Sequence, residues 1–128
     1  MAKAALATTV NSNYSDGGRE RWIDLVFLGR QTMGNKALEL EILKLFKTQL
    51  EIHLVQLAHM EDETQLRVRL HTIKGAAHGV GANEVGQLAA KIEKELMNNG
   101  QIQPGGVDRL RQAVQQTCNF IADLLETK

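Results

Sequence analysis

The sequence predicts an all-α protein: an antiparallel up-down-up-down four-helix bundle with a short N-terminal helical extension. Residues that favour helices, such as Leu, Ala, Glu, Gln and Lys, dominate the chain after residue 35. Aromatic residues make up only 4% of the 128 residues and proline occurs once, which argues against a β-sandwich or a β-barrel. Four long segments repeat apolar residues at spacings of three and four, and the short breaks between them make neighbouring helices antiparallel.

The start of the chain is polar. Residues 1 to 20 are rich in Asn, Ser, Asp and Gly and have little to bury, so we expect a flexible segment there and the bundle in residues 21 to 128. The apolar run from Trp22 to Leu28 predicts a short helix that covers part of the bundle. Gly34 then interrupts the chain, and Asn35 can cap the helix that follows.

The bundle is expected to contain four helices, over residues 36 to 59, about 61 to 81, 83 to 98 and 106 to 126. The first of them carries two adjoining apolar stripes, which predict contacts with two neighbours. One stripe contains Leu38, Ile42 and Leu45. The acidic run at residues 61 to 63 suits the N-terminus of the second helix, and either Gly79 or Gly81 would end it.

The composition argues against several classes of protein. Fifteen basic residues balance fifteen acidic ones, so no net charge would attract nucleic acid or a membrane surface. No run of about 18 apolar residues occurs, and the first residues are too weakly apolar for a signal peptide. Cys118 is alone and cannot form a disulfide within the chain, and its apolar position predicts a buried side chain. We therefore expect a cytoplasmic protein.

The segment HTIKGAAHGVGA, residues 71 to 82, contains the candidate functional residues. At about 100° per residue, the apolar side chains of this helix form one stripe, and His71 points roughly 140° away from the core. Gly75 and His78 lie within about 40° of His71, and Lys74 lies about 60° to one side. His71 is therefore expected on the exposed face of the helix.

Gly75 costs the helix about 1 kcal/mol relative to alanine, so its place beside His71 needs a reason. Close approach by another molecule is one reason, and tight packing between helices is the alternative. A neutral imidazole can attack a phosphoryl group, the Lys74 ammonium can offset phosphate charge, and a missing side chain admits a donor protein. These residues predict a phosphoryl acceptor.

The same segment resembles the signature of histidine-containing phosphotransfer (HPt) domains, H-x-[LI]-K-G-[AS]-[AS]-x-x-[IVL]-G. Every specified position is met, by His71, Ile73, Lys74, Gly75, Ala76, Ala77, Val80 and Gly81. The resemblance extends over about residues 22 to 126. It implies that His71 accepts the phosphoryl group, that Lys74 orients the phosphate, and that Gly75 provides clearance for the partner.

The resemblance also implies the partners and the reaction. A receiver domain would dock on His71 and transfer the phosphoryl group of its phospho-aspartate, and a second receiver would accept that group in turn. These receivers are expected in a hybrid histidine kinase and in a downstream regulator of a two-component pathway. Mg²⁺ is expected in the receiver, and no cofactor is expected in this chain. The protein would be a monomeric carrier without ATP-dependent kinase activity.

The docking rim around the histidine is expected to include Ala76, His78, Gly79 and Ala82, with a contribution from the short first helix. No metal site is expected. His71 and His78 lie about 10.5 Å apart along one helix, and His53 and His59 fall on opposite sides of another.

Two other functions stay open. One is a non-catalytic helical module that binds a receiver or a kinase, although such a scaffold would need neither His71 nor Lys74. The other is the dimerising hairpin of a histidine kinase. Such hairpins usually follow the phosphorylated histidine with an acidic residue, whereas position 72 here is Thr.

Overall fold

The computed structural model describes residues 22–59 and 62–126. Within these residues the chain forms five helices and no strand: α1 (Leu25–Gln31), α2 (Lys36–Leu57), α3 (Glu63–Val80), α4 (Asn83–Asn99) and α5 (Gly106–Glu126). The all-α prediction is confirmed, and the expected bounds of the long helices agree to within a few residues. The flexible segment expected at residues 1 to 20 lies outside the described residues.

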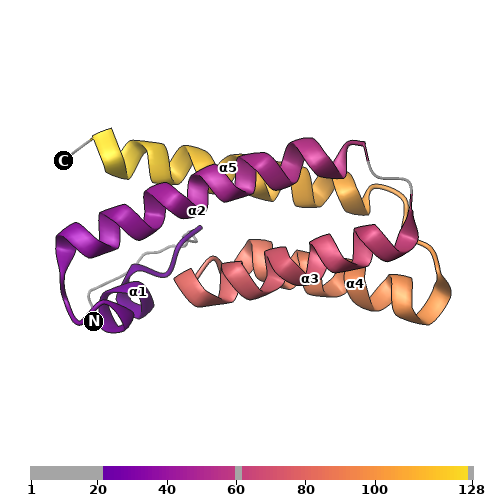
Figure 1. The fold of residues 1–128 in the computed structure, drawn as a ribbon, viewed down its shortest axis with the longest axis horizontal. Coiled ribbons are helices and arrows are strands. Elements are labelled where there is room, and N and C mark those ends of the chain that lie inside the picture. The colour runs from indigo at the N-terminus through magenta and orange to yellow at the C-terminus, as the bar shows by residue number, and fades with distance from the viewer. Residues whose placement is uncertain (1–21, 60–61, 127–128) are drawn as a thin grey trace.

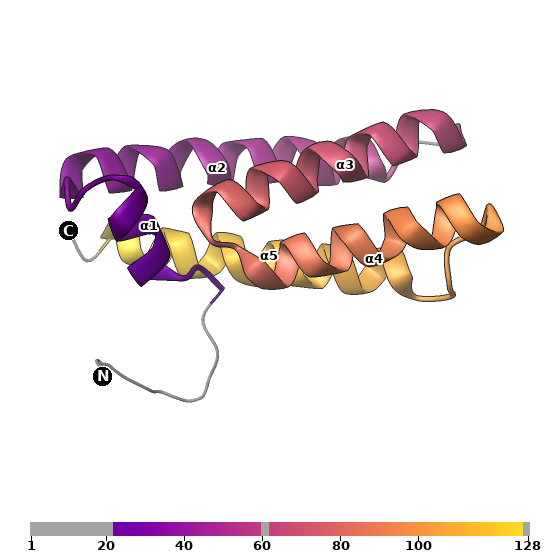
Figure 2. The same cartoon turned by 90° about the horizontal axis from the view of Figure 1, so that it is seen from below.

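The four long helices form an antiparallel bundle, and α1 lies at one end of it (Figure 1). Each long helix packs on two neighbours in a closed cycle: α2 contacts α3 and α5, and α4 contacts the same two helices. Figure 2 shows this cycle from a second direction, with α2 and α3 in one layer and α4 and α5 in the other. The predicted up-down-up-down topology is therefore confirmed.

Polar residues at the helix starts and a glycine at the end of α3 set the helix bounds. Asp24, Asn35 and Asp62 precede α1, α2 and α3, and a side-chain oxygen of each accepts a hydrogen bond from a backbone N–H of the first turn. Of the two glycines expected to end α3, Gly81 does so with a φ of +82°, a conformation that favours glycine. Gly79 lies inside the helix.

The short first helix starts later than expected. It begins after Asp24 rather than at Trp22, because the Asp24 side chain caps the first turn. Ile23 precedes the helix and is fully buried, so this part of the apolar run anchors the chain without a helical turn. The Asp24 N–H donates to the Gly81 carbonyl at 2.8 Å, which joins the start of α1 to the end of α3.

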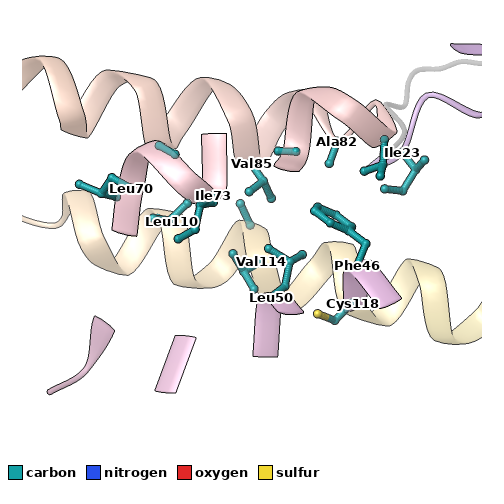
Figure 3. Close-up of a cluster of buried hydrophobic side chains, with 14 of the residues drawn as sticks. Ile23, Phe46, Leu50, Leu70, Ile73, Ala82, Val85, Leu110, Val114 and Cys118 are labelled. Carbon is teal, nitrogen blue, oxygen red and sulfur yellow. The ribbon is translucent and has the colours of Figure 1, made fainter. Parts of the chain in front are cut away.

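The interior of the bundle is apolar. Figure 3 shows side chains from several helices directed into one shared core. Leu70 and Ile73 of α3 are fully buried, as their place on the predicted apolar stripe requires. Each such side chain stabilises the fold by roughly 1.5–3 kcal/mol relative to an exposed one. Cys118 is also buried, as expected.

One prediction for α2 is wrong. Leu38 and Leu45, which were expected to face a second neighbour, are 45% and 62% exposed. The short first helix α1 does not cover this stripe, because it packs on the side of Glu39, where a Cβ at Gly29 would lie 3.5 Å from Oε2. Of the stripe, Ile42 is partly buried and packs against the core. The core contacts of α2 come mainly from the other stripe, in which Leu43 and Leu50 are fully buried.

Candidate functional site

His71 lies in the middle of α3 with its side chain in solvent. The imidazole is 69% exposed, whereas Leu70 and Ile73, which lie on either side of it in sequence, are fully buried. The predicted position on the outer face of α3 is therefore confirmed. A molecule outside the bundle can reach the ring directly.

The imidazole has a carboxylate partner on the neighbouring helix. In α4, Glu93 places Oε2 3.1 Å from Nδ1 of His71 and Oε1 3.1 Å from Nζ of Lys74. This arrangement is possible because α3 and α4 pack side by side, and because residues three apart lie on one side of a helix. One carboxylate thus bridges the imidazole and the ammonium, and these three residues are called the triad below.

Glu93 is ionised in the triad. Its side chain is only 15% exposed, and this burial opposes ionisation. Hydrogen bonds from Lys74 and His71 outweigh the burial and lower the pKa of Glu93 below its ordinary value of 4.5. Lys74 therefore has a charge partner in the unphosphorylated protein, which the sequence did not predict.

The glycines beside His71 leave open space. Apart from the two adjoining residues and the helix's own nearby backbone, no described atom lies within 4 Å of the position that a Cβ would take at Gly75 or at Gly79. The alternative explanation of Gly75, tight packing between helices, is therefore wrong. The exposed face of α3 has bare backbone one and two turns beyond the histidine.

The structure divides the four residues expected at the docking rim. His78 and Gly79 are exposed and Ala76 is partly buried, so all three are accessible. Ala82 is fully buried and belongs to the core cluster drawn in Figure 3, so its prediction as a rim residue is wrong. An uninterrupted α3 would place Ala82 on the exposed face, but the helix ends at Gly81, where the left-handed backbone redirects the chain into the core.

His78 also has a packing role. A Cβ at Gly86 of α4 would lie 2.8 Å from Cδ2 of the His78 ring. Gly86 therefore gives this ring room against α4, and packing accounts for part of its position. Among the described residues, no charged side chain forms a hydrogen bond or ion pair with His78, whereas Glu93 does so with His71.

A groove borders His71 between α3 and α4, with a volume of about 280 Å³. Its lining consists of Thr64, Arg67, Val68, His71, Thr72, Glu93 and Met97. Val68 and Met97 are 62% and 64% exposed, so two large apolar side chains stand in solvent beside the imidazole. Neither was predicted as a site residue. Val68 lies three residues before His71, so helical spacing could have found it, whereas Met97 and Glu93 belong to another helix.

The other candidate groups lie apart from the triad. Burial, reinforced by the charge of Glu51, raises the pKa of Cys118 to about 11, so its thiol is protonated and unreactive at neutral pH. The described residues contain no group of three His, Cys, Asp or Glu side chains that could hold a metal ion. Nor does any helix in this part of the chain have the length and apolar character needed to cross a bilayer.

Comparison with known proteins identifies a family. A family model described as "Hpt domain" matches residues 41–120, which is more than half of the 128-residue chain. The matched range contains all three residues of the triad and the whole of α3 and α4. No curated protein and no solved structure matches the chain.

Proposed function

The chain belongs to the Hpt domain family, whose members transfer phosphoryl groups through histidine in two-component phosphorelays, and on this premise we propose that His71 is the phosphorylated residue. The donor is the phospho-aspartate of one receiver domain, and the acceptor is the aspartate of another. The observation that carries this proposal is an exposed imidazole with an ammonium beside it and bare backbone next to it.

The reaction exchanges one bond to phosphorus for another. A ring nitrogen of His71 donates its lone pair to phosphorus while the bond from phosphorus to the aspartate oxygen breaks. The aspartate leaves as a carboxylate, and the reverse reaction with a second receiver regenerates the imidazole. Lys74 contributes a positive charge on a flexible side chain that can reach the transferred group. Mg²⁺ is supplied by the receiver and not by this chain.

The docking face surrounds His71. Gly75 and Gly79 have no side chains to obstruct a partner, and the groove on the other side offers Val68 and Met97 for apolar contact. A patch of this kind suits a transient complex that buries less than about 1,200 Å² in total. α1, which is joined to the end of α3, would extend the face at that end of the bundle.

Phosphotransfer from a labelled receiver tests the proposal. Incubation with a phosphorylated receiver domain and Mg²⁺ should label the protein through a bond that is labile to acid and stable to base. His71→Gln should abolish labelling while circular dichroism shows unchanged helical content, because the side chain is exposed. His59→Gln, which removes an exposed histidine that follows α2, is the matched control and should be labelled normally.

Two outcomes would contradict the proposal. Labelling of the His71→Gln protein would place the acceptor at another residue. If the unaltered protein binds receivers but takes no phosphoryl group from any of them, the chain is a non-catalytic binding module.

A further inference from the structure

The outer side of α2 exposes a row of large apolar side chains. Leu38, Leu45 and Ile52, which lie seven residues apart, are 45%, 62% and 44% exposed, and Val55 is 62% exposed. At about 100° per residue, this row points roughly 140° away from the buried side chains of the same helix. Of the eight large apolar side chains exposed within the described residues, four lie in this row. Exposure concentrated on one face in this way indicates an interaction surface.

The row follows the heptad pattern of a coiled coil, whose positions are lettered a to g. With Leu38 at position a, the a positions hold Leu38, Leu45 and Ile52, and the d positions hold Glu41, Thr48 and Val55. All six residues are exposed, and they are called the α2 seam below. The seam spans about 26 Å, and its repeat of seven would keep a second helix in contact along this length.

The polar member at the middle of the seam can be covered without losing a hydrogen bond. The Thr48 hydroxyl donates to the Lys44 carbonyl of its own helix at 3.2 Å. The hydroxyl therefore keeps its partner when water is excluded, and the methyl group of Thr48 is available for apolar contact. Glu41, the charged member of the seam, lies toward one end.

We propose that the α2 seam is a homodimer interface, in which α2 of one copy packs antiparallel against α2 of a second copy. A two-fold axis would bring the same residues of both copies together. Contact between one pair of helices over this length falls in the class of small, transient interfaces, so the dimer forms reversibly. The proposal departs from the monomer that the family resemblance implies, and it does not depend on phosphorylation of His71.

Charged residues beside the seam select one antiparallel register. Lys44 and Glu51 occupy g positions, and both are exposed. When Leu45 of one copy lies opposite Thr48 of the other, Lys44 of each copy lies beside Glu51 of the other, which gives two ion pairs across the interface. A shift of one heptad in either direction would instead bring together two copies of Lys44 or two copies of Glu51. Glu51 already pairs with Lys47 of its own helix at 2.8 Å, and its carboxylate can accept from both ammonium groups.

A parallel pair of helices fits these charges less well. It would place Glu41 of one copy directly against Glu41 of the other, and like charges at the seam oppose association. In the antiparallel register the two Glu41 residues lie about 16 Å apart along the axis, which exceeds the Debye length of roughly 10 Å. A parallel pair would also leave Lys44 and Glu51 beside neutral glutamine side chains at e positions.

The seam and the proposed receiver-docking face lie on different sides of the bundle. The triad bridges α3 and α4, and α4 lies diagonally across the bundle from α2 (Figure 2). The α2 seam points away from the core, and so also away from α4. Each copy in the dimer can therefore present His71 to a receiver.

Sedimentation velocity over a range of protein concentrations tests the interface. From about 1 μM to about 500 μM, the unaltered protein should convert from monomer to dimer. Leu45→Glu places a charge near the centre of the seam and should remain monomeric over the same range. Its helical content and thermal stability should stay unchanged at low concentration, because the side chain is exposed. Val26→Glu alters a comparably exposed side chain of α1, at 67%, and is the matched control that should dimerise normally.

Charge reversal tests the register. Lys44→Glu makes both g positions acidic and Glu51→Lys makes both basic, so each variant alone should dimerise at least about 10-fold more weakly. An equal mixture of the two variants should form a heterodimer, because every acidic g position then faces a basic one. Lys91→Glu, which alters an exposed side chain of α4, should dimerise like the unaltered protein.

Four results would overturn the proposal. The unaltered protein could stay monomeric at every concentration; a loss of stability in Leu45→Glu would then show that another part of the same chain covers the seam. A dimer that survives Leu45→Glu would use another face. Two charge variants that do not associate with each other would exclude this register. A monomeric protein whose Leu45→Glu variant alone fails to accept phosphate would assign the seam to the receiver. Because the dimer is measured without phosphate, its absence would leave the test of His71 unaffected.

Discussion

Lys74 exchanges one negative partner for another during the proposed reaction. In the free protein its ammonium lies 3.1 Å from a Glu93 oxygen, and its side chain is 30% exposed. Lys74→Ala should slow phosphoryl transfer by about 10-fold or more, because a charge positioned beside the transferred group is lost. The free energy of unfolding should change by less than about 1 kcal/mol, since surface ion pairs contribute little. Rapid-quench transfer assays and urea denaturation measure the two quantities.

The matched control for this variant is Lys91→Ala, which removes an exposed cation from α4. It should transfer at the original rate, because the triad does not include Lys91. A Lys74→Ala protein that transfers as fast as this control would show that phosphate charge is offset by the receiver alone.

Individual site residues differed in how far the sequence could predict them. His71, Lys74 and Gly75 share one helix, so residue spacing alone places them on or beside one face. Glu93 joins them only because α4 packs beside α3, and no spacing rule relates positions on two helices. Ala82 shows that the angular argument holds only as far as the helix extends. Gly81, the left-handed residue before it, turns the chain so that Ala82 is buried and not exposed.

Two glycines, Gly75 inside α3 and Gly81 at its C-cap, should respond in opposite ways to replacement by alanine. Gly75 lies in the helix interior with open space around it, so Gly75→Ala should raise the free energy of unfolding by roughly 0.5–1 kcal/mol. Gly81 has a φ of +82°, and a Cβ there would lie 3.1 Å from the carbonyl oxygen of Asp24. Gly81→Ala should therefore lower the free energy of unfolding by about 1–3 kcal/mol. Urea denaturation of the two variants side by side measures both effects.

Each of these two variants is the control for the other, because each adds one methyl group, one inside α3 and one at its C-cap. Equal effects would mean that neither the backbone conformation of Gly81 nor the open surface at Gly75 governs stability. Gly75→Leu extends the comparison to function. It should weaken receiver binding without lowering stability, because the larger side chain occupies the face that the partner needs.

The helices themselves were largely predictable, whereas the neighbours that cover each helix face were not. Capping residues and glycines act locally, so the bounds of α2 to α5 follow closely from the sequence. An apolar stripe indicates that a face can be buried but not that a neighbour exists to bury it. Leu38 and Leu45 stay exposed because no described helix packs over them, and α1 lies on the side of Glu39 instead.

At the scale of the whole molecule, a partly buried pair between α2 and α3 links folding to pH. Nη1 of Arg69 lies 3.1 Å from Nδ1 of His53, and because a guanidinium can only donate, Nδ1 is the acceptor. Burial, together with the Arg69 charge, lowers the pKa of His53 below its ordinary value of 6.5. A proton on Nδ1 would remove the acceptor and place a second positive charge beside Arg69.

The free energy of unfolding should therefore fall as the pH is lowered. Below about pH 6.5 His53 binds a proton in the unfolded chain but stays neutral in the folded protein, where its pKa is lower. Proton binding therefore stabilises the unfolded state relative to the folded one. The loss begins near that pH and ends once the pH passes the lowered pKa of the folded state. Urea denaturation between about pH 7.5 and pH 5 covers this range. It stays above the pH range in which Glu93, whose pKa is also lowered, would change the free energy of unfolding.

His53→Gln should flatten this dependence, and His59→Gln, which removes an exposed histidine, should retain it. If both variants keep the slope of the unaltered protein, the dependence on pH arises from groups other than the pair of His53 and Arg69.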